Sequence, residues 1–190
     1  MIRSFIAIEL PAAVRGAVGD VQARLLRARL GVKVSWTRPD NIHLTLQFLG
    51  NIPDELVPRI STSLAAVAGK QGTFDLPVGG VGAFPNLRAP HVLWVGCRDK
   101  AGKLKALTGA VQTAMQEFGF VPERREFAAH LTLGRAKWPR PDAALTRVLD
   151  SVKDADCGAM RVDVVHLFQS QLQPQGSIYT KLSSHPLKGD

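Results

Sequence analysis

Apolar and polar positions along the first half of the chain predict two strands and two helices in alternation. Residues 3–10, RSFIAIEL, and residues 41–50, NIHLTLQFLG, are apolar-rich segments that predict strands, and the second ends at a glycine. Helical spacing predicts a helix after Pro11 and another after Pro53. The apolar positions of the first helix are Val14, Val18, Val21 and Leu25, and those of the second are Leu56, Ile60, Leu64 and Val67.

The second half repeats this alternation, and the whole pattern predicts an α+β fold. Strands are expected at 91–97 (HVLWVGC), 127–134 (FAAHLTLG), within 160–170 (MRVDVVHLFQS) and at 177–182 (SIYTKL). Helices are expected over an amphipathic stretch and, more weakly, over 141–152. The amphipathic stretch carries Leu104, Leu107, Val111, Met115 and Phe118. Residues 78–90, VGGVGAFPNLRAP, are rich in glycine and proline and predict a loop.

One four-residue sequence, His-Leu-Thr-Leu, occurs twice. It occupies residues 43–46 and again residues 130–133, so the two copies are 87 residues apart (130 − 43). Each copy lies on a predicted strand near a predicted helix. Solenoid repeats have shorter periods and more copies, so this spacing indicates two related α+β lobes.

Strand geometry separates the polar and apolar residues of each copy. Side chains alternate between the two faces of a strand, so His43, Thr45 and Gln47 are expected on one face. The other face then carries Ile42, Leu44, Leu46 and Phe48. In the second copy, His130 and Thr132 share a face and Leu131 and Leu133 lie behind them. Each copy therefore presents one imidazole and one hydroxyl on a face open to solvent or ligand.

Two such strands facing one groove would combine the groups needed to cleave a phosphodiester. One imidazole can accept a proton while the other donates one, and the threonine hydroxyls can hold phosphate oxygens. A single His-x-Thr is more typical of a half-buried polar strand face, and it is the second copy that favours catalysis. Metal ligation is the other functional interpretation. It is disfavoured because the two histidines have no Asp, Glu or Cys at ligand spacing.

Charge and composition narrow the class of protein. The 190 residues carry a formal net charge of +8 with a pI near 10, which favours a polyanionic partner, nucleic acid before an anionic membrane surface. Two cysteines without CxxC spacing argue against a zinc knuckle and indicate a reducing cytoplasm. The opening MIRSFIAIELP is too short an apolar run for a signal peptide, and no stretch reaches the roughly 18 apolar residues of a membrane helix.

The repeated motif and its surroundings resemble a known superfamily. HLTL and HLTLGR resemble the duplicated His-x-Thr-x signature of the 2H phosphoesterases, in particular the RNA 2′,3′-cyclic phosphodiesterase branch once named 2′-5′ RNA ligases. The resemblance runs almost end to end. It includes SFIAIELP, WTRPDNIHLTLQFLGNIP, GVGAFPNLRAPHVLWVG, GFVPERREFAAHLTLGRA and VVHLFQSQLQPQGSIYTKL. Ala129 departs from it, since proline is expected before the second motif.

The resemblance implies one bilobal 2H phosphoesterase domain over residues 1–190, with two pseudo-symmetric lobes whose sheets line a central groove. It implies His43 as general acid and proton donor, His130 as general base and proton acceptor, and Thr45 and Thr132 as phosphate ligands. No metal or cofactor is expected. The partner is an RNA with a 2′,3′-cyclic phosphate end, and we expect a cytoplasmic monomer that does not associate with membranes.

Several further residues are candidates with competing interpretations. Arg135 would suit a phosphate, but strict alternation places it on the leucine side unless the strand breaks at Gly134. Phe5, Trp36 and Phe84 are candidates for stacking on a terminal base, although core packing is the more typical role. His91, His166 and His185 lack a threonine two residues on, and none is a candidate catalytic group. Tyr179 lies on a predicted strand that the resemblance places near the groove.

Three activities follow from these residues. The first is hydrolysis of a cyclic phosphate to a 2′-phosphomonoester, in which His130 activates water and His43 protonates the departing ribose oxygen. The second is the reverse reaction, 2′-5′ ligation of a 5′-hydroxyl RNA end. The third is a non-catalytic module that binds RNA ends, which the two intact histidines disfavour because a binder needs no acid and base.

Overall fold

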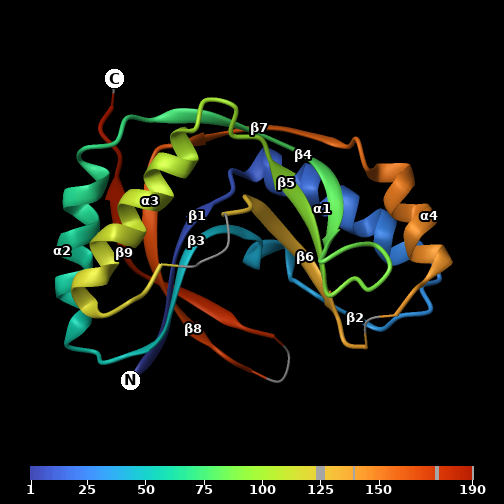
Figure 1. The fold of residues 1–190 in the computed structure, drawn as a ribbon, viewed down its shortest axis with the longest axis horizontal. Coiled ribbons are helices and arrows are strands. Elements are labelled where there is room, and N and C mark those ends of the chain that lie inside the picture. Colours follow the sequence, from blue (N-terminus) through green and yellow to red (C-terminus); the bar gives the residue numbers. More distant parts are fainter. Residues whose placement is uncertain (123–126, 139, 174–175, 190) are drawn as a thin grey trace.

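The strands form a curved antiparallel sheet whose two halves curl around a shared face (Figure 1). The computed structural model describes residues 1–122, 127–138, 140–173 and 176–189, so the PERRE and QPQG stretches lie partly outside the described residues. Over these described residues the sheet has nine strands, eight of them in the order β7-β4-β5-β6-β3-β1-β8-β9 and the ninth, β2, beside β6. Their bounds are β1 Ile2–Glu9, β2 Val34–Trp36, β3 His43–Ile52, β4 Phe74–Phe84, β5 Val92–Cys97, β6 His130–Ala136, β7 Asp156–Val162, β8 Val164–Gln171 and β9 Ile178–Pro186.

The two halves of the sheet meet where the repeated motifs lie. Strands β3 and β6 pair through Leu44 and Leu131, so one residue of each His-Leu-Thr-Leu copy joins the lobes. The expected α+β, bilobal fold is confirmed. The sheets of the two lobes are joined here instead of standing apart.

Within the described part of the chain, four α-helices cover the outer faces of the sheet in two pairs. They are α1 Ala12–Arg27, α2 Leu56–Ala68, α3 Lys103–Met115 and α4 Ala143–Val152. Helices α2 and α3 pack on the lobe of β3, β8 and β9, whereas α1 and α4 pack on the lobe of β4 and β7 (Figure 1). Each half of the sequence therefore sends its first helix to the lobe that holds the other half's motif.

The predicted apolar stripes of the helices form the core. Val14, Val18, Val21 and Leu25 of α1 are buried, as are Leu104, Leu107, Val111 and Met115 of α3. Among the described residues, no helix is both long enough and apolar enough to cross a bilayer.

The loop predicted over 78–90 is wrong for its first seven residues, which belong to β4. This strand pairs on both sides, with β5 and with β7. Its glycines have steric causes: a Cβ on Gly82 would lie 2.5 Å from the Trp94 ring, and Gly80 has φ +76° at an irregularity in the pairing. Composition indicated a turn where close packing across the strand requires glycine.

The predicted alternation in β3 is also wrong beyond Leu46. Thr45 pairs with Ala7 and Gln47 with Ile6, which leaves Leu46 as an extra residue in a β-bulge. The bulge reverses the faces that follow. Gln47 is therefore buried with 7% exposure, and Phe48 is 57% exposed on the groove side.

Candidate active site

The joining of β3 and β6 brings the two candidate His-Thr pairs together. Because the strands are antiparallel around Leu44 and Leu131, His43 lies toward Thr132 and Thr45 lies toward His130, on the face opposite the leucines. All four side chains are half-buried. The expected grouping of two imidazoles and two hydroxyls therefore forms at the centre of the molecule.

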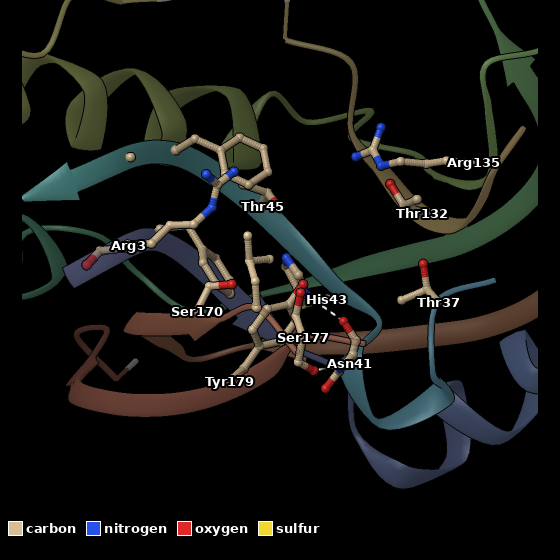
Figure 2. A pocket seen from close by; sticks show the side chains of 15 residues that line it. Arg3, Thr37, Asn41, His43, Thr45, Thr132, Arg135, Ser170, Ser177 and Tyr179 are labelled. Carbon is tan, nitrogen blue, oxygen red and sulfur yellow. Dashed lines mark hydrogen bonds between the residues drawn. The ribbon is translucent and has the colours of Figure 1, made fainter. Parts of the chain in front are cut away.

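The candidate residues line two adjoining hollows of one groove. The first has a volume of about 460 Å³ and is lined by His43, Thr45, Thr132 and Arg135, as Figure 2 shows. The second has a volume of about 670 Å³ and contains His130. Thr45, Phe48 and Arg135 line both hollows, so they form the boundary between the two histidines.

Main-chain carbonyls fix both imidazole rings in the same way. The Nδ1 of His43 donates to the carbonyl of Asn41 at 2.7 Å, and the Nδ1 of His130 donates to the carbonyl of Ala128 at 2.7 Å. A carbonyl oxygen only accepts, so Nδ1 carries a proton in each ring. The Nε2 atoms are left to accept or donate a proton, which is the requirement for acid–base chemistry.

Aromatic rings pack against each candidate imidazole. The ring of Phe5 stacks on His43 with centroids 4.7 Å apart, and Tyr179 meets His43 edge-on at 5.3 Å. In the other lobe, Phe84 meets His130 edge-on at 5.0 Å. Phe5 and Phe84 therefore pack against the histidines themselves.

Burial sets the protonation of His43. Removal from water lowers the pKa of His43 below its ordinary value, and the nearby His130 acts in the same direction. The hydrogen bond to the Asn41 carbonyl opposes this shift. The free protein therefore holds His43 mainly neutral near pH 7, and the ring becomes charged more readily when an anion lies beside it.

Arg135 reaches the groove because strict alternation, which would place it on the leucine side, is interrupted by a bulge next to Gly134. Gly134 pairs with Leu93 and Thr132 with Trp94, so Leu133 is the extra residue of a bulge. Alternation then restarts, and Arg135 is exposed in both hollows. A Cβ on Gly134 would lie 2.8 Å from Val34 Cγ1, which explains the glycine.

The two bulges are equivalent in the two motifs. Leu46 in β3 and Leu133 in β6 each follow the threonine directly. The residue five positions after the histidine thus turns into the groove in both cases. It is Phe48 in one lobe and Arg135 in the other, so equivalent positions of the two motifs present an aromatic ring and a guanidinium to the groove.

Gln22 supports the second bulge and was not identified from the sequence. It lies on α1 with 3% exposure, and its Nε2 donates to the carbonyls of Leu133 at 2.8 Å and Thr37 at 2.7 Å. The N–H of Thr37 also donates to the Leu133 carbonyl at 2.9 Å. The sequence signal that could have identified Gln22 is its position beside Val21, on the apolar face of the helix.

Other residues that line the groove also lie outside the two His-Leu-Thr-Leu motifs. Asn41 holds the lobe around His43 together, since its Nδ2 donates to the carbonyl of Ser177 at 2.6 Å. Arg3, Thr37 and Ser170 complete the polar lining (Figure 2). On the last two strands, Ser170 carries no sequence signal, whereas the family resemblance associates the strand of Tyr179 with the groove. Trp36 packs partly against the core and lines a side hollow with Arg38.

The remaining histidines lie outside the two hollows or at their rim. His166 is buried, hydrogen-bonds Ser184 at 2.9 Å and lies 3.6 Å from Glu9. His185 is buried and hydrogen-bonds Ser183 at 2.8 Å. His91 lies at the rim of the larger hollow. In the part of the chain that the structure describes, no group of three or more His, Cys, Asp or Glu side chains is placed to hold a metal ion.

Comparison with known sequences places this geometry in a family. The LigT like Phosphoesterase family matches residues 8–94 and 95–179, one copy for each motif. The chain is 35% identical over 155 residues to an RNA 2′,3′-cyclic phosphodiesterase of Aeropyrum pernix, covering 82% of this chain and 87% of that protein. It is 34% identical over 181 residues to one of Archaeoglobus fulgidus, covering 95% and 98%.

Solved structures show the same fold. The TT0787 protein of Thermus thermophilus superposes with a TM-score of 0.82 at 28% identity, over 100% of both chains. Escherichia coli LigT complexed with 3′-AMP superposes with a TM-score of 0.70 at 26% identity, over 98% of both chains. The chain, with its duplicated motif and its two-lobed sheet, belongs to the LigT-like phosphoesterase family of 2H phosphoesterases.

Proposed function

We propose that this protein is an RNA 2′,3′-cyclic phosphodiesterase that hydrolyses the cyclic end to a 2′-phosphomonoester by a metal-independent, two-histidine mechanism. The observation that carries the proposal is the twin arrangement of His43 and His130. Each ring donates through Nδ1 to a carbonyl two residues earlier, so each has its Nε2 left for a proton transfer. The names of the relatives support the same substrate class.

In the proposed reaction, His130 is the general base and His43 the general acid. Neutral His130 takes a proton from water through Nε2 as the water oxygen attacks phosphorus. The bond from phosphorus to the ribose 3′-oxygen breaks, and His43 gives that oxygen its proton. In-line attack requires the base behind phosphorus and the acid beside the leaving oxygen, which suits two imidazoles in adjoining hollows of one groove.

Three side chains between the histidines would hold the phosphate. Thr45 and Thr132 carry hydroxyls that can donate to the non-bridging oxygens. Arg135 supplies the positive charge that stabilises the extra negative charge of the transition state. Its place on the boundary of both hollows supports this role.

Substrate binding would also favour the charged form of His43, which is the form that can donate a proton. Burial lowers the pKa of His43, which leaves less of the charged acid in the free protein. A bound phosphate diester is an anion, and an opposite charge favours the imidazolium form. Binding and activation of the acid are thereby coupled.

The orientation of the ribose decides which phosphate remains. We propose the orientation that the family resemblance implies, with the 3′-oxygen beside His43, which would leave a 2′-phosphate. The test is to digest an oligoribonucleotide with a 2′,3′-cyclic end in the presence of a chelator, then treat the product with a phosphatase specific for 3′-phosphates. Resistance of the phosphate supports the proposal, and its ready removal would mean the substrate binds the other way round.

The same assay separates the alternatives. Adding an RNA with a 5′-hydroxyl end tests for ligation, since that hydroxyl would replace water as the nucleophile that attacks phosphorus, with the ribose 3′-oxygen leaving and a 2′-5′ linkage formed. Binding without any turnover would indicate a module that only holds RNA ends. It would overturn the enzymatic proposal.

The proposal extends to the state of the protein in the cell. We take residues 1–190 as one domain. One sheet runs through both lobes, and helices α1 and α3 each pack on the lobe that holds the other half's motif. Cys97 and Cys157 are free thiols, which supports a reducing cytoplasm. We propose a monomer, which sedimentation at the working concentration would test.

A further inference from the structure

A pair of strands carries the groove beyond the candidate catalytic residues. In β2 and β6, Ser35 pairs with Arg135, and the N–H of Lys137 donates to the carbonyl of Lys33 at 2.9 Å. Side chains two residues apart on a strand share a face, so these four residues line one face. All four are exposed, whereas Val34 packs toward the core from the other face. We call Lys33, Ser35, Arg135 and Lys137 the basic ribbon.

The hollow of the groove leads onto this ribbon. A third hollow of about 410 Å³ is lined by Ser35, Arg38 and Arg135. It shares Thr37 and Arg135 with the hollow that contains His43. A ligand held at the candidate catalytic centre therefore has a continuous path to Ser35 and Arg135, and Lys33 and Lys137 lie beyond them on the same strand face.

The positive charges along this path are not neutralised. Within residues 1–122, 127–138, 140–173 and 176–189, none of Lys33, Arg38 and Lys137 takes part in an ion pair. The carboxylate of Asp142 lies near the end of the path at Lys33, but main-chain N–H groups occupy its oxygens. Its oxygens accept from four main-chain N–H groups, those of Gly31, Val32, Ala144 and Leu145.

An aromatic side chain follows the charges. Trp138 comes directly after Lys137 and is 77% exposed. Unpaired cations along an exposed strand pair are typical of surfaces that bind single-stranded nucleic acid, where the cations meet phosphates. An exposed aromatic ring that follows them in the sequence is available to stack on a base. Phosphate contacts of this kind are independent of sequence.

We propose that the basic ribbon binds the phosphates of the RNA strand that leads 5′ from the cyclic end. This inference rests on the proposed function and specifies its substrate class. The enzyme is then selective for oligoribonucleotides over cyclic mononucleotides, because only an oligomer reaches from the groove to Lys33 and Lys137.

The test compares two substrates in wild-type protein and in a double variant, Lys33→Gln with Lys137→Gln. The substrates are adenosine 2′,3′-cyclic phosphate and an eight-nucleotide RNA with a 2′,3′-cyclic end. The ratio of kcat/KM for the oligomer to kcat/KM for the mononucleotide is expected to fall at least tenfold in the double variant at low salt. The slope of log(kcat/KM) for the oligomer against log[salt] is expected to become shallower by about 1.4, from about 0.7 per lost phosphate contact on a single strand.

A matched control is Lys70→Gln with Lys100→Gln, since both lysines are exposed and lie outside the hollows described here. This control variant should keep the wild-type substrate ratio. An unchanged ratio in the ribbon variant, or an equal loss on both substrates, would overturn the inference while leaving the proposed reaction intact.

A binding measurement makes the test independent of turnover. Fluorescence anisotropy with a labelled eight-nucleotide RNA ending in a 2′-phosphate should give a dissociation constant at least tenfold higher for the ribbon variant than for the control. Equal constants would overturn the inference. If the wild-type protein turned over neither substrate, that result would instead count against the proposed function.

Discussion

The side-chain amide of Gln22 donates to the main-chain carbonyl of Leu133 at 2.8 Å, across 111 residues of sequence. Leu133 is the extra residue of the bulge in β6, and the bulge turns Arg135 into the groove. The same amide donates to the Thr37 carbonyl at 2.7 Å, so α1 anchors the bulge and one wall of the groove together. A buried helix residue thus positions a candidate phosphate ligand that it does not touch.

Replacing Gln22 should therefore weaken both stability and activity. Gln22→Met keeps the length of the side chain but removes both donated hydrogen bonds, the buried one to the Leu133 carbonyl and the half-buried one to the Thr37 carbonyl. We expect a loss of about 1–3 kcal/mol in the free energy of unfolding, measured by urea denaturation. We also expect lower kcat/KM, because the bulge that orients Arg135 loses its support.

Two comparisons show whether this effect passes through Arg135. Thr108→Val removes another buried polar group from a helix, and its hydroxyl has no hydrogen-bond partner among the residues that the structure describes, so this control should retain activity. In an Arg135→Ala background, Gln22→Met should have little further effect on kcat/KM. Fully additive losses would mean that Gln22 does not act by positioning Arg135.

Arg135 itself should matter more for turnover than for folding. The side chain is exposed, so Arg135→Ala should leave the unfolding free energy within about 0.5 kcal/mol of wild type. We expect a fall in kcat of about 10²–10³, the range for removing one preorganised group that stabilises transition-state charge. Arg135→Lys should recover part of the loss, since lysine keeps the charge without the planar fork. Unchanged kcat in Arg135→Ala would remove Arg135 from the proposed site.

The titration of His43 can be followed directly by NMR. Burial lowers the pKa of His43, so its ring protons should titrate with a midpoint below 6.5 in the free protein. Inorganic phosphate in the groove should raise that midpoint, because the anion favours the charged ring. His43→Gln identifies the signal by its loss. A midpoint at or above 6.5 without phosphate would contradict this description of the site.

Stability should decline just below neutral pH. Burial lowers the pKa values of His43, His166 and His185, so the unfolded chain binds more protons than the folded protein once the pH falls below about 6.5. The stabilisation is complete above that value and is lost as the pH falls through the folded pKa values. Each histidine contributes at most about 1.4 kcal/mol per pH unit.

His185→Asn offers the cleanest check of this slope, because burial causes the lowering of the His185 pKa. Urea unfolding between about pH 7.5 and 5.5 should show a shallower loss of stability in the variant than in wild type. Asp54 and Asp142 titrate below their ordinary value of 3.8 and do not contribute in this range. Equal slopes would show that His185 is not buried in its neutral form.

The sequence allowed the motif strands and the helix stripes to be predicted because each depends on local periodicity. His43, Thr45, His130 and Thr132 share a face for the same reason, and the pairing of Leu44 with Leu131 brings them together. The partner lobe of each helix could not be predicted, since spacing along the chain does not say which sheet a helix covers.

The periodicity of the sequence could not predict the two bulges or the extent of β4. Alternation holds only while a strand keeps its register, and the extra residue in β6 is held by Gln22 from another element. Phe48 and Gln47 were assigned to the wrong faces because β3 loses its register in the same way. In β4, the glycine at position 82 accommodates the Trp94 ring, a tertiary contact that composition presents as a loop signal.

The most direct test of the two-histidine mechanism is turnover of an oligoribonucleotide 2′,3′-cyclic phosphate by wild type, His43→Gln and His130→Gln, with chelator present. Wild type should release one 2′-phosphate product per cyclic end. Each variant should be slower by about 10²–10⁴ while circular dichroism shows an intact fold, because one proton-transfer group is missing in each. Near-normal turnover by either folded variant, or loss of wild-type turnover on adding chelator, would contradict the mechanism.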